Sequence, residues 1–171
     1  MPDSFEVFVR TSGPGLLRYA TLLCGNAANA EDLLQEVLAR AYPRWSRVST
    51  DNPEAYLRRA MSNSVISWWR SPWSRRRVPY PGEMSEPEDA VARADDRQMI
   101  LAALGSLPPR MRSVVVLRYW LGFSEQDTAA ELGCSTGSVK SQASRGLQRL
   151  RAALQVDHVK TGNTRGEGWI G

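Results

Sequence analysis

The stretch that most constrains the fold is residues 123–154, FSEQDTAAELGCSTGSVKSQASRGLQRLRAAL. Ser124 followed three residues later by Asp127 is typical of the start of a helix, because the pair can satisfy free backbone N–H groups there. Gly133 supplies the left-handed backbone position that ends a helix at low cost. Ser135 or Thr136 can then cap a second helix. The stretch therefore predicts two helices joined by a tight turn.

The second of these helices has two contrasting faces. Its apolar residues recur at three- and four-residue steps, which predicts a buried side: Val139, Ala143, Leu147, Leu150 and Leu154. Residues 136–151 contain four basic side chains and no acid, whereas the preceding helix carries Glu125, Asp127 and Glu131. A basic helix presented by an acidic one is typical of a helix-turn-helix that reads DNA. The alternative is an ordinary helical hairpin with a solvated basic face.

The rest of the chain also has helical periodicity. A short helix at Phe5, Phe8 and Val9 should stop at residues 13–15, Gly-Pro-Gly, and a second should cover residues 16–23. Asn29 can cap a third helix, which runs to about Tyr42. Residues 43–51 are predicted to be a loop, and Asn52-Pro53 is typical of the start of the next helix. Further helices are predicted at residues 96–104 and 110–120, the latter with Met111, Val114, Val115, Leu117 and Tyr119 as packing positions.

The predicted fold is all-α, with two small helical domains joined by a flexible acidic linker. The first domain covers residues 5–77, and the linker, with three prolines and mostly acidic charges, covers residues 78–95. The second domain, residues 96–154, is a four-helix unit that ends in the helix-turn-helix. The glycine-rich residues 155–171 read as a disordered tail.

Arginine and tryptophan are interleaved at the end of the first domain. Residues 58–77 contain six arginines and no acid, together with Trp68, Trp69 and Trp73. Cations for the backbone and flat rings for unstacked bases are what single-stranded nucleic acid requires. The alternative is that some of the tryptophans belong to the core.

Composition argues against several other classes. The only cysteines, Cys24 and Cys134, lie in unrelated segments, and His158 is the only histidine, so we expect no metal site and no cofactor. A nuclease could use Glu31, Asp32 and Glu36, but no second carboxylate cluster accompanies them, so we expect no catalytic residues and no enzyme. No apolar run could span a bilayer and the N-terminus lacks signal-peptide character, which predicts a cytoplasmic protein without membrane insertion.

Three segments together carry a family resemblance. AEDLLQEV at residues 30–37 resembles the AEDLxQE segment of bacterial sigma factors. AYLRRAMSNSVISWWR at residues 55–70 is similar to their region 2 helix, and residues 105–151 are similar to their region 4. The short acidic linker between them resembles that of the extracytoplasmic-function sigma factors, and the arginine-rich sequence with its WW pair resembles an actinobacterial sigma-E-like subgroup. The resemblance covers about residues 5–154.

The resemblance implies roles for individual residues. Residues that match the surface docking on core polymerase are Asp32, Gln35 and Glu36. Residues that match the −35 reader are Thr136, Ser138, Lys140, Ser141, Ser144, Arg145 and Arg149. Residues expected at the melted −10 element, where Asn63 lies beside a flipped-base site, are Arg58, Arg59, Asn63, Ser67, Trp68, Trp69, Arg70, Arg75, Arg76 and Arg77. Ser67 replaces the family's common aspartate and Gln142 its usual arginine, which puts the base preference and one phosphate contact in doubt.

The resemblance also implies partners. These are the clamp helices of the largest polymerase subunit, the flap of the second-largest subunit and promoter DNA, with an anti-sigma protein as a further candidate. The expected function is to bring core polymerase to −35 and −10 promoter elements and to promote melting of the duplex. The alternative is a stand-alone helix-turn-helix regulator that uses residues 105–151 without polymerase.

Overall fold

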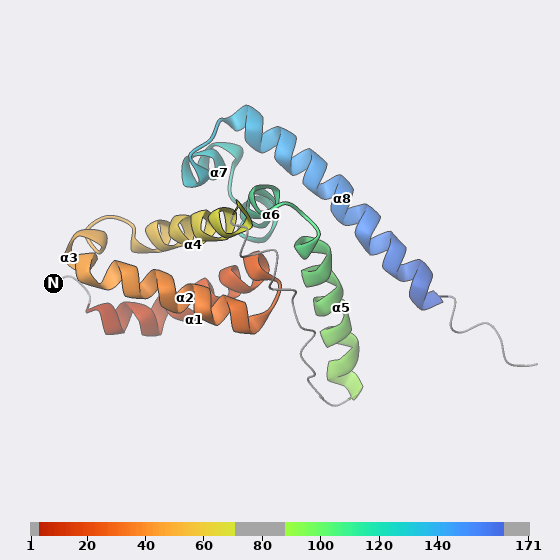
Figure 1. The fold of residues 1–171 in the computed structure, drawn as a ribbon, viewed down its shortest axis with the longest axis horizontal. Helices are drawn as coiled ribbons and strands as arrows, with labels where there is room; N and C mark the ends of the chain where they lie inside the picture. The colour runs from red at the N-terminus through yellow and green to blue at the C-terminus, as the bar shows by residue number, and fades with distance from the viewer. Residues whose placement is uncertain (1–3, 71–87, 163–171) are drawn as a thin grey trace, which may run out of the picture.

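The computed structural model describes residues 4–70 and 88–162, with side chains described for residues 4–68 and 94–155. Every regular element in these two ranges is helical, as the sequence predicts (Figure 1). The predicted DNA contacts Arg75, Arg76 and Arg77, most of the predicted linker and residues 163–171 lie outside the described ranges.

The N-terminal segment forms one helix, where the sequence predicted two. Helix α1 spans Phe5–Cys24 and contains Pro14 in its interior. A proline there removes one backbone hydrogen bond. The helix continues because apolar side chains on both sides of the proline, Phe8 before it and Leu16 and Leu23 after it, pack into the same core. It ends at Gly25, whose φ of 80° is the left-handed position that glycine adopts readily.

The next three elements lead to the helix that carries the predicted −10 contacts. Helix α2 spans Ala27–Ala41, and its cap is Asn26, three residues before the predicted Asn29. The predicted loop instead holds two short turns, η1 (Tyr42–Arg44) and α3 (Trp45–Val48). The Trp45 ring packs against Phe5 and Phe8, with centroids 5.1 and 4.8 Å away. Helix α4 spans Pro53–Arg70 and begins as predicted, with the Ala55 amide donating to the Asn52 side chain.

The C-terminal half contains the predicted four-helix unit, with longer outer helices. Its elements are α5 (Glu88–Gly105), α6 (Pro109–Val115), the π-helical turn η3 (Val116–Trp120), α7 (Glu125–Leu132) and α8 (Thr136–Gly162). Helix α5 therefore begins within the predicted linker, and α8 continues eight residues beyond Leu154 into the predicted tail, from 155 to 162. Tyr119, predicted to pack, is 47% exposed, because the π-helical turn shifts its register relative to the buried Leu117.

The two halves pack against each other around a continuous apolar core. Helix α4 contacts α6 and α7, and α1 contacts α5 and α6 (Figure 1). The buried cluster runs from Leu23, Leu33 and Leu57 in the first half to Leu104 and Val114 in the second. No sequence pattern predicted this contact between the halves. The contact decides which of the predicted site residues are free to bind a partner.

Candidate nucleic-acid and polymerase interface

The helix-turn-helix is built as the sequence predicts. The Asp127 amide donates to the Ser124 hydroxyl at 3.0 Å, and that hydroxyl donates to the Asp127 carboxylate at 2.7 Å. Gly133 ends α7 with a φ of 62°. Of the two candidate caps of α8, Ser135 is used, because the Ser138 amide donates to its hydroxyl at 3.1 Å. The Ser124 and Ser135 hydroxyls therefore cap the starts of α7 and α8 on either side of the turn.

Helix α8 presents all the residues expected at the −35 element on its exposed surface. These exposed residues are Thr136, Ser138, Lys140, Ser141, Ser144, Arg145 and Arg149. On the opposite side Val139, Ala143 and Leu150 are buried, as the periodicity predicts. Lys140 forms a loose ion pair with Glu125 of α7, with 3.6 Å between Nζ and Oε2. The face is therefore open, hydrophilic and basic.

Gly146, which is not among the predicted site residues, allows α8 to lie close to α6. A Cβ added there would lie 2.4 Å from Cγ2 of Val115 and 3.2 Å from Cγ of Met111. The sequence does contain one signal for such a close helix–helix approach. Gly146 follows Ala143 by three positions, so the two small residues share one side of the helix. The contact sets the orientation of α8 on the second half of the molecule.

Part of the predicted −10 set lines a hollow between α2 and α4. Asn63, Ser67 and Trp68 are exposed on α4, and they border a shallow hollow of about 380 Å³. Its other walls are Arg40, Arg44, Tyr56, Val37, Ala60 and Ser64. Trp69 and Arg70 belong to the last turn of α4, and their side chains are outside the described set. The hollow combines guanidinium groups with two exposed rings, a combination suited to unstacked bases.

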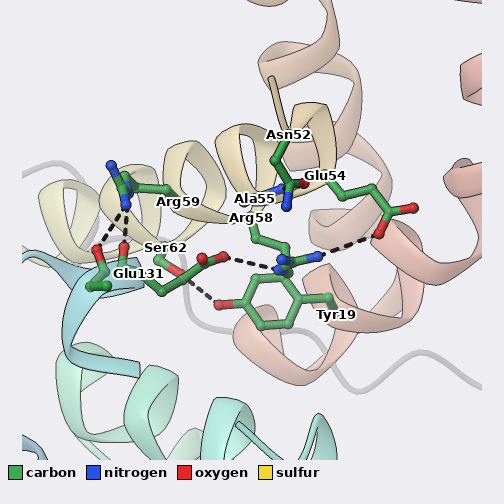
Figure 2. A network of polar contacts seen from close by, with 9 residues as sticks. Tyr19, Asn52, Glu54, Ala55, Arg58, Arg59, Ser62 and Glu131 are labelled. Atoms are coloured by element: carbon green, nitrogen blue, oxygen red, sulfur yellow. Dashed lines mark hydrogen bonds and ion pairs between the residues drawn. The ribbon is translucent and has the colours of Figure 1, made fainter. Parts of the chain in front are cut away.

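Arg58 and Arg59, also predicted at the −10 element, are already engaged within the chain. The Arg58 Nε donates to the Glu131 carboxylate at 2.9 Å, and its Nη1 lies 3.5 Å from Glu54 (Figure 2). Arg59 donates to two main-chain carbonyls at the end of α7, those of Glu131 at 3.0 Å and Ala130 at 2.7 Å. Among the members of the predicted −10 set whose side chains are described, the structure therefore separates exposed residues from residues held by α7.

The predicted docking residues share the outer side of α2. Asp32 and Gln35 are exposed, and the Glu36 side chain is 34% exposed and paired with Arg40 one turn later. Leu33 and Val37 on the inner side are buried. The structure thus places the three predicted residues together, on the side of α2 that faces away from the core.

Buried polar groups hold the two halves together, and sequence reasoning missed them. Arg112 is 5% exposed and donates to the carbonyls of Leu104, Gly105 and Leu107 in its own half and to that of Leu23 at the end of α1. Its burial lowers the guanidinium pKa, and four carbonyl acceptors offset the lost hydration. An arginine one turn into an apolar helix was the signal available in the sequence.

Burial also perturbs two groups of α1. It raises the pKa of Tyr19 far above its ordinary range, so the phenol is neutral and shares a 2.7 Å hydrogen bond with Ser62 (Figure 2). It raises the pKa of the Cys24 thiol to about 11, although nearby Arg112 acts in the opposite direction. Cys24 is therefore a protonated, unreactive thiol at neutral pH.

The described residues offer no group of three or more histidine, cysteine, aspartate or glutamate side chains that could hold a metal ion. Among those same residues, no helix combines the length and the apolar character needed to cross a membrane.

Both halves match known sequence families. The family model of sigma-70 region 2 matches residues 8–75, and that of sigma-70 region 4 matches residues 97–150. The first match contains α2 and α4, and the second contains the helix-turn-helix of α7 and α8. A stand-alone regulator built on the second half alone would leave the first match unexplained.

Whole-chain comparisons agree with these matches. The RNA polymerase sigma-E factor of Streptomyces coelicolor is 44% identical over 88% of this chain and 85% of its own length. The sigma factor SigL of Mycobacterium tuberculosis, an extracytoplasmic-function sigma factor, is 36% identical over 82% of each chain. The solved structure of the sigma factor RpoE of Bartonella quintana, bound to the anti-sigma factor NepR, superposes with a TM-score of 0.66 at 27% identity, covering 90% of this chain and 98% of that one. The chain therefore belongs to the sigma-70 family, as an RNA polymerase sigma factor of the extracytoplasmic-function type.

Proposed function

We propose that this sigma factor reads the −35 promoter element with the exposed face of α8 while α4 binds the melted −10 element and α2 docks on core polymerase. The observation that carries the proposal is the two-sided character of α8. Its seven predicted contact residues are all exposed, and the opposite side is fixed on α6. Arg145 offers a planar fork of N–H donors and Lys140 a single ammonium group, and both can bind guanine or phosphate. The serine hydroxyls can hydrogen-bond to bases or phosphates at short range.

The hollow between α2 and α4 supports the −10 assignment. Asn63 on its rim can hydrogen-bond the edge of a flipped base, and the exposed rings of Tyr56 and Trp68 can stack on neighbouring bases. Arg40 and Arg44 widen the predicted −10 set, because they bring positive charge to the same hollow. Capture of unstacked bases by this hollow would stabilise the melted duplex, with each stacked base contributing about 1–3 kcal/mol.

The outer side of α2 supports the docking assignment. Asp32, Gln35 and Glu36 form a compact acidic and amide surface that the protein's own core does not use. Such a surface suits the clamp helices of the largest polymerase subunit. Region 4 would meanwhile contact the flap of the second-largest subunit, so that the two halves attach at separate points of the enzyme.

Each predicted domain binds a different partner. Residues 5–77 serve the polymerase and the −10 element, residues 96–154 serve the −35 element, and the acidic residues 78–95 connect them along the RNA exit path of the polymerase. The chain needs no cofactor and has no catalytic activity of its own, since RNA synthesis belongs to the polymerase. It acts in the cytoplasm, and an anti-sigma protein is a candidate regulator because the similar RpoE was solved with one.

The test is transcription by core polymerase from a library of genomic fragments, with and without this chain. We expect new start sites that share a −35 and a −10 sequence. Transcripts that stay at the level of core polymerase alone on every fragment would refute the proposal.

A pair of variants tests the docking surface within the same assay. Asp32→Arg with Glu36→Arg should abolish co-purification with core polymerase while leaving the circular dichroism spectrum unchanged. The matched control is Glu6→Arg with Asp96→Arg, which makes the same charge change on exposed positions of α1 and α5, outside both the docking surface and residues 78–95. Retained binding by the α2 variant, or equal loss by both variants, would show that docking occurs elsewhere.

A further inference from the structure

An acidic side chain borders the basic reading face of α8. Glu125 is the first residue of α7, and its Oε2 lies 3.6 Å from Nζ of Lys140 on α8. The two side chains are 37% and 67% exposed, so the ion pair faces solvent. An ion pair this exposed contributes little to the stability of a fold. Its place on the surface that we assign to the −35 element suggests a role in recognition instead.

The pair lies where a recognition helix meets the bases. Helix α8 begins at Thr136, so Lys140 is about one turn from its N-terminus. In helix-turn-helix proteins the N-terminal residues of the second helix contact base edges in the major groove, while the first helix crosses the backbone. Glu125 belongs to the first helix, but the ion pair brings its carboxylate to the second. An anion and a cation therefore stand side by side at the end of α8 that enters the groove.

Together the two groups match the major-groove edge of a G·C base pair. Guanine presents two acceptors there, O6 and N7, and its paired cytosine presents the N4 amino donor. An ammonium has three donors, so Lys140 can keep Glu125 and still donate to guanine. A carboxylate accepts through both oxygens, so Glu125 can hold Lys140 through Oε2 and accept from cytosine through Oε1. An A·T pair instead turns the adenine amino donor toward the lysine and the thymine O4 acceptor toward the carboxylate, which opposes both contacts.

The carboxylate also discourages the contact that Lys140 would make alone. A lysine binds phosphate readily as a point charge. A negative group beside it repels phosphate, and a repulsive element of this kind contributes to specificity. Asp127, the other acid in the first turn of α7, has a different role, because it accepts from the Ser124 hydroxyl at 2.7 Å. Among the acids of this turn, only Glu125 has an ion pair with the proposed −35 residues.

We propose that Glu125 and Lys140 jointly read one G·C base pair of the −35 element. Lys140 donates to the guanine, and Glu125 accepts from the cytosine of the same pair. The inference rests on the −35 role proposed above for α8. It adds Glu125 as a specificity-determining residue and states the class of base pair that this residue recognises.

The experiment uses the polymerase holoenzyme formed with the full chain. It binds a promoter library randomised across the −35 element, and the bound DNA is sequenced to give the base preference at each position. The variants are Glu125→Gln and Lys140→Ala. The matched control, Asp127→Asn, removes the same charge from the same turn and keeps an oxygen for the Ser124 hydroxyl. Circular dichroism verifies the helices of each variant, and binding is also measured on the selected promoter and on single changes of it.

We expect Lys140→Ala and Glu125→Gln to relax the same position. Each should lower its preference for G·C over A·T about tenfold, as expected for the loss of one specific base contact. Asp127→Asn should keep the preference of the parent chain at that position. The glutamine variant should relax toward A·T in particular, because a side-chain amide both donates and accepts and can bind adenine.

Several results would overturn the inference while leaving the proposed function intact. In one, Glu125→Gln keeps the parent preference at every position, although Lys140→Ala alters one. In another, the two variants relax different positions. An equal gain in affinity on every sequence would show that Glu125 only repels the DNA backbone. A parent holoenzyme without any preference across the −35 element would instead refute the proposed function, and the inference with it.

Discussion

The close approach of α8 to α6 leads to the sharpest stability prediction. Gly146→Ala places a methyl group 2.4 Å from Cγ2 of Val115, well inside van der Waals contact. Met111 can rotate away, because its side chain is flexible. Val115 cannot, because it is 0% exposed and β-branched, with one preferred rotamer in a helix. The helices must therefore move apart.

The magnitude follows from two opposing effects. Overpacking of a core typically costs about 1–3 kcal/mol, and alanine in place of glycine within a helix contributes up to about 1 kcal/mol in return. Gly137, in the first turn of the same helix, is exposed, and a Cβ there would meet only the Ser135 hydroxyl, at 3.9 Å. Gly137→Ala therefore gains the helix propensity of alanine without overpacking the core. We expect the two alanine variants to differ by about 1–3 kcal/mol, with Gly146→Ala the less stable.

The assay is thermal unfolding of the two variants followed by circular dichroism. For a chain of this size, 1 kcal/mol corresponds to about 2–4 °C in Tm, so the expected difference is about 2–12 °C. Val115→Ala combined with Gly146→Ala should recover part of the loss, because it removes the methyl group that clashes. If Gly146→Ala melts at or above the temperature of Gly137→Ala, the reasoning on α6 and α8 is wrong.

Two further predictions concern arginines in region 4. Arg112→Lys should lower the free energy of unfolding by about 3 kcal/mol, because a single ammonium cannot reach all four carbonyls. Urea unfolding measures this, with the exposed Arg110→Lys as the control. Equal stability of the two lysine variants would contradict the prediction. Arg145→Ala should weaken binding to the −35 element by about 1–3 kcal/mol if the side chain contacts a base, as measured on the cognate promoter and on promoters with single changes. An equal loss on every sequence would assign Arg145 to phosphate instead.

The local features of the helix-turn-helix could be predicted because they depend on neighbours in the sequence. Ser124, Gly133 and Ser135 act through backbone groups within a few residues, so the caps and the turn were confirmed. The buried side of α8 was predicted for the same reason, since helical periodicity alone places Val139 and Ala143 on one face. The −35 residues were predicted from the family resemblance instead, and the structure places them on the exposed side of the helix.

Features that depend on distant packing could not be predicted. Pro14 is tolerated inside α1 because the apolar residues on both sides of it enter the same core, a reason that lies outside the Gly-Pro-Gly motif itself. Tyr119 is exposed because a π-helical turn shifts the register after Val115. The engagement of Arg58 by Glu131, 73 positions away, has no local sequence signature at all.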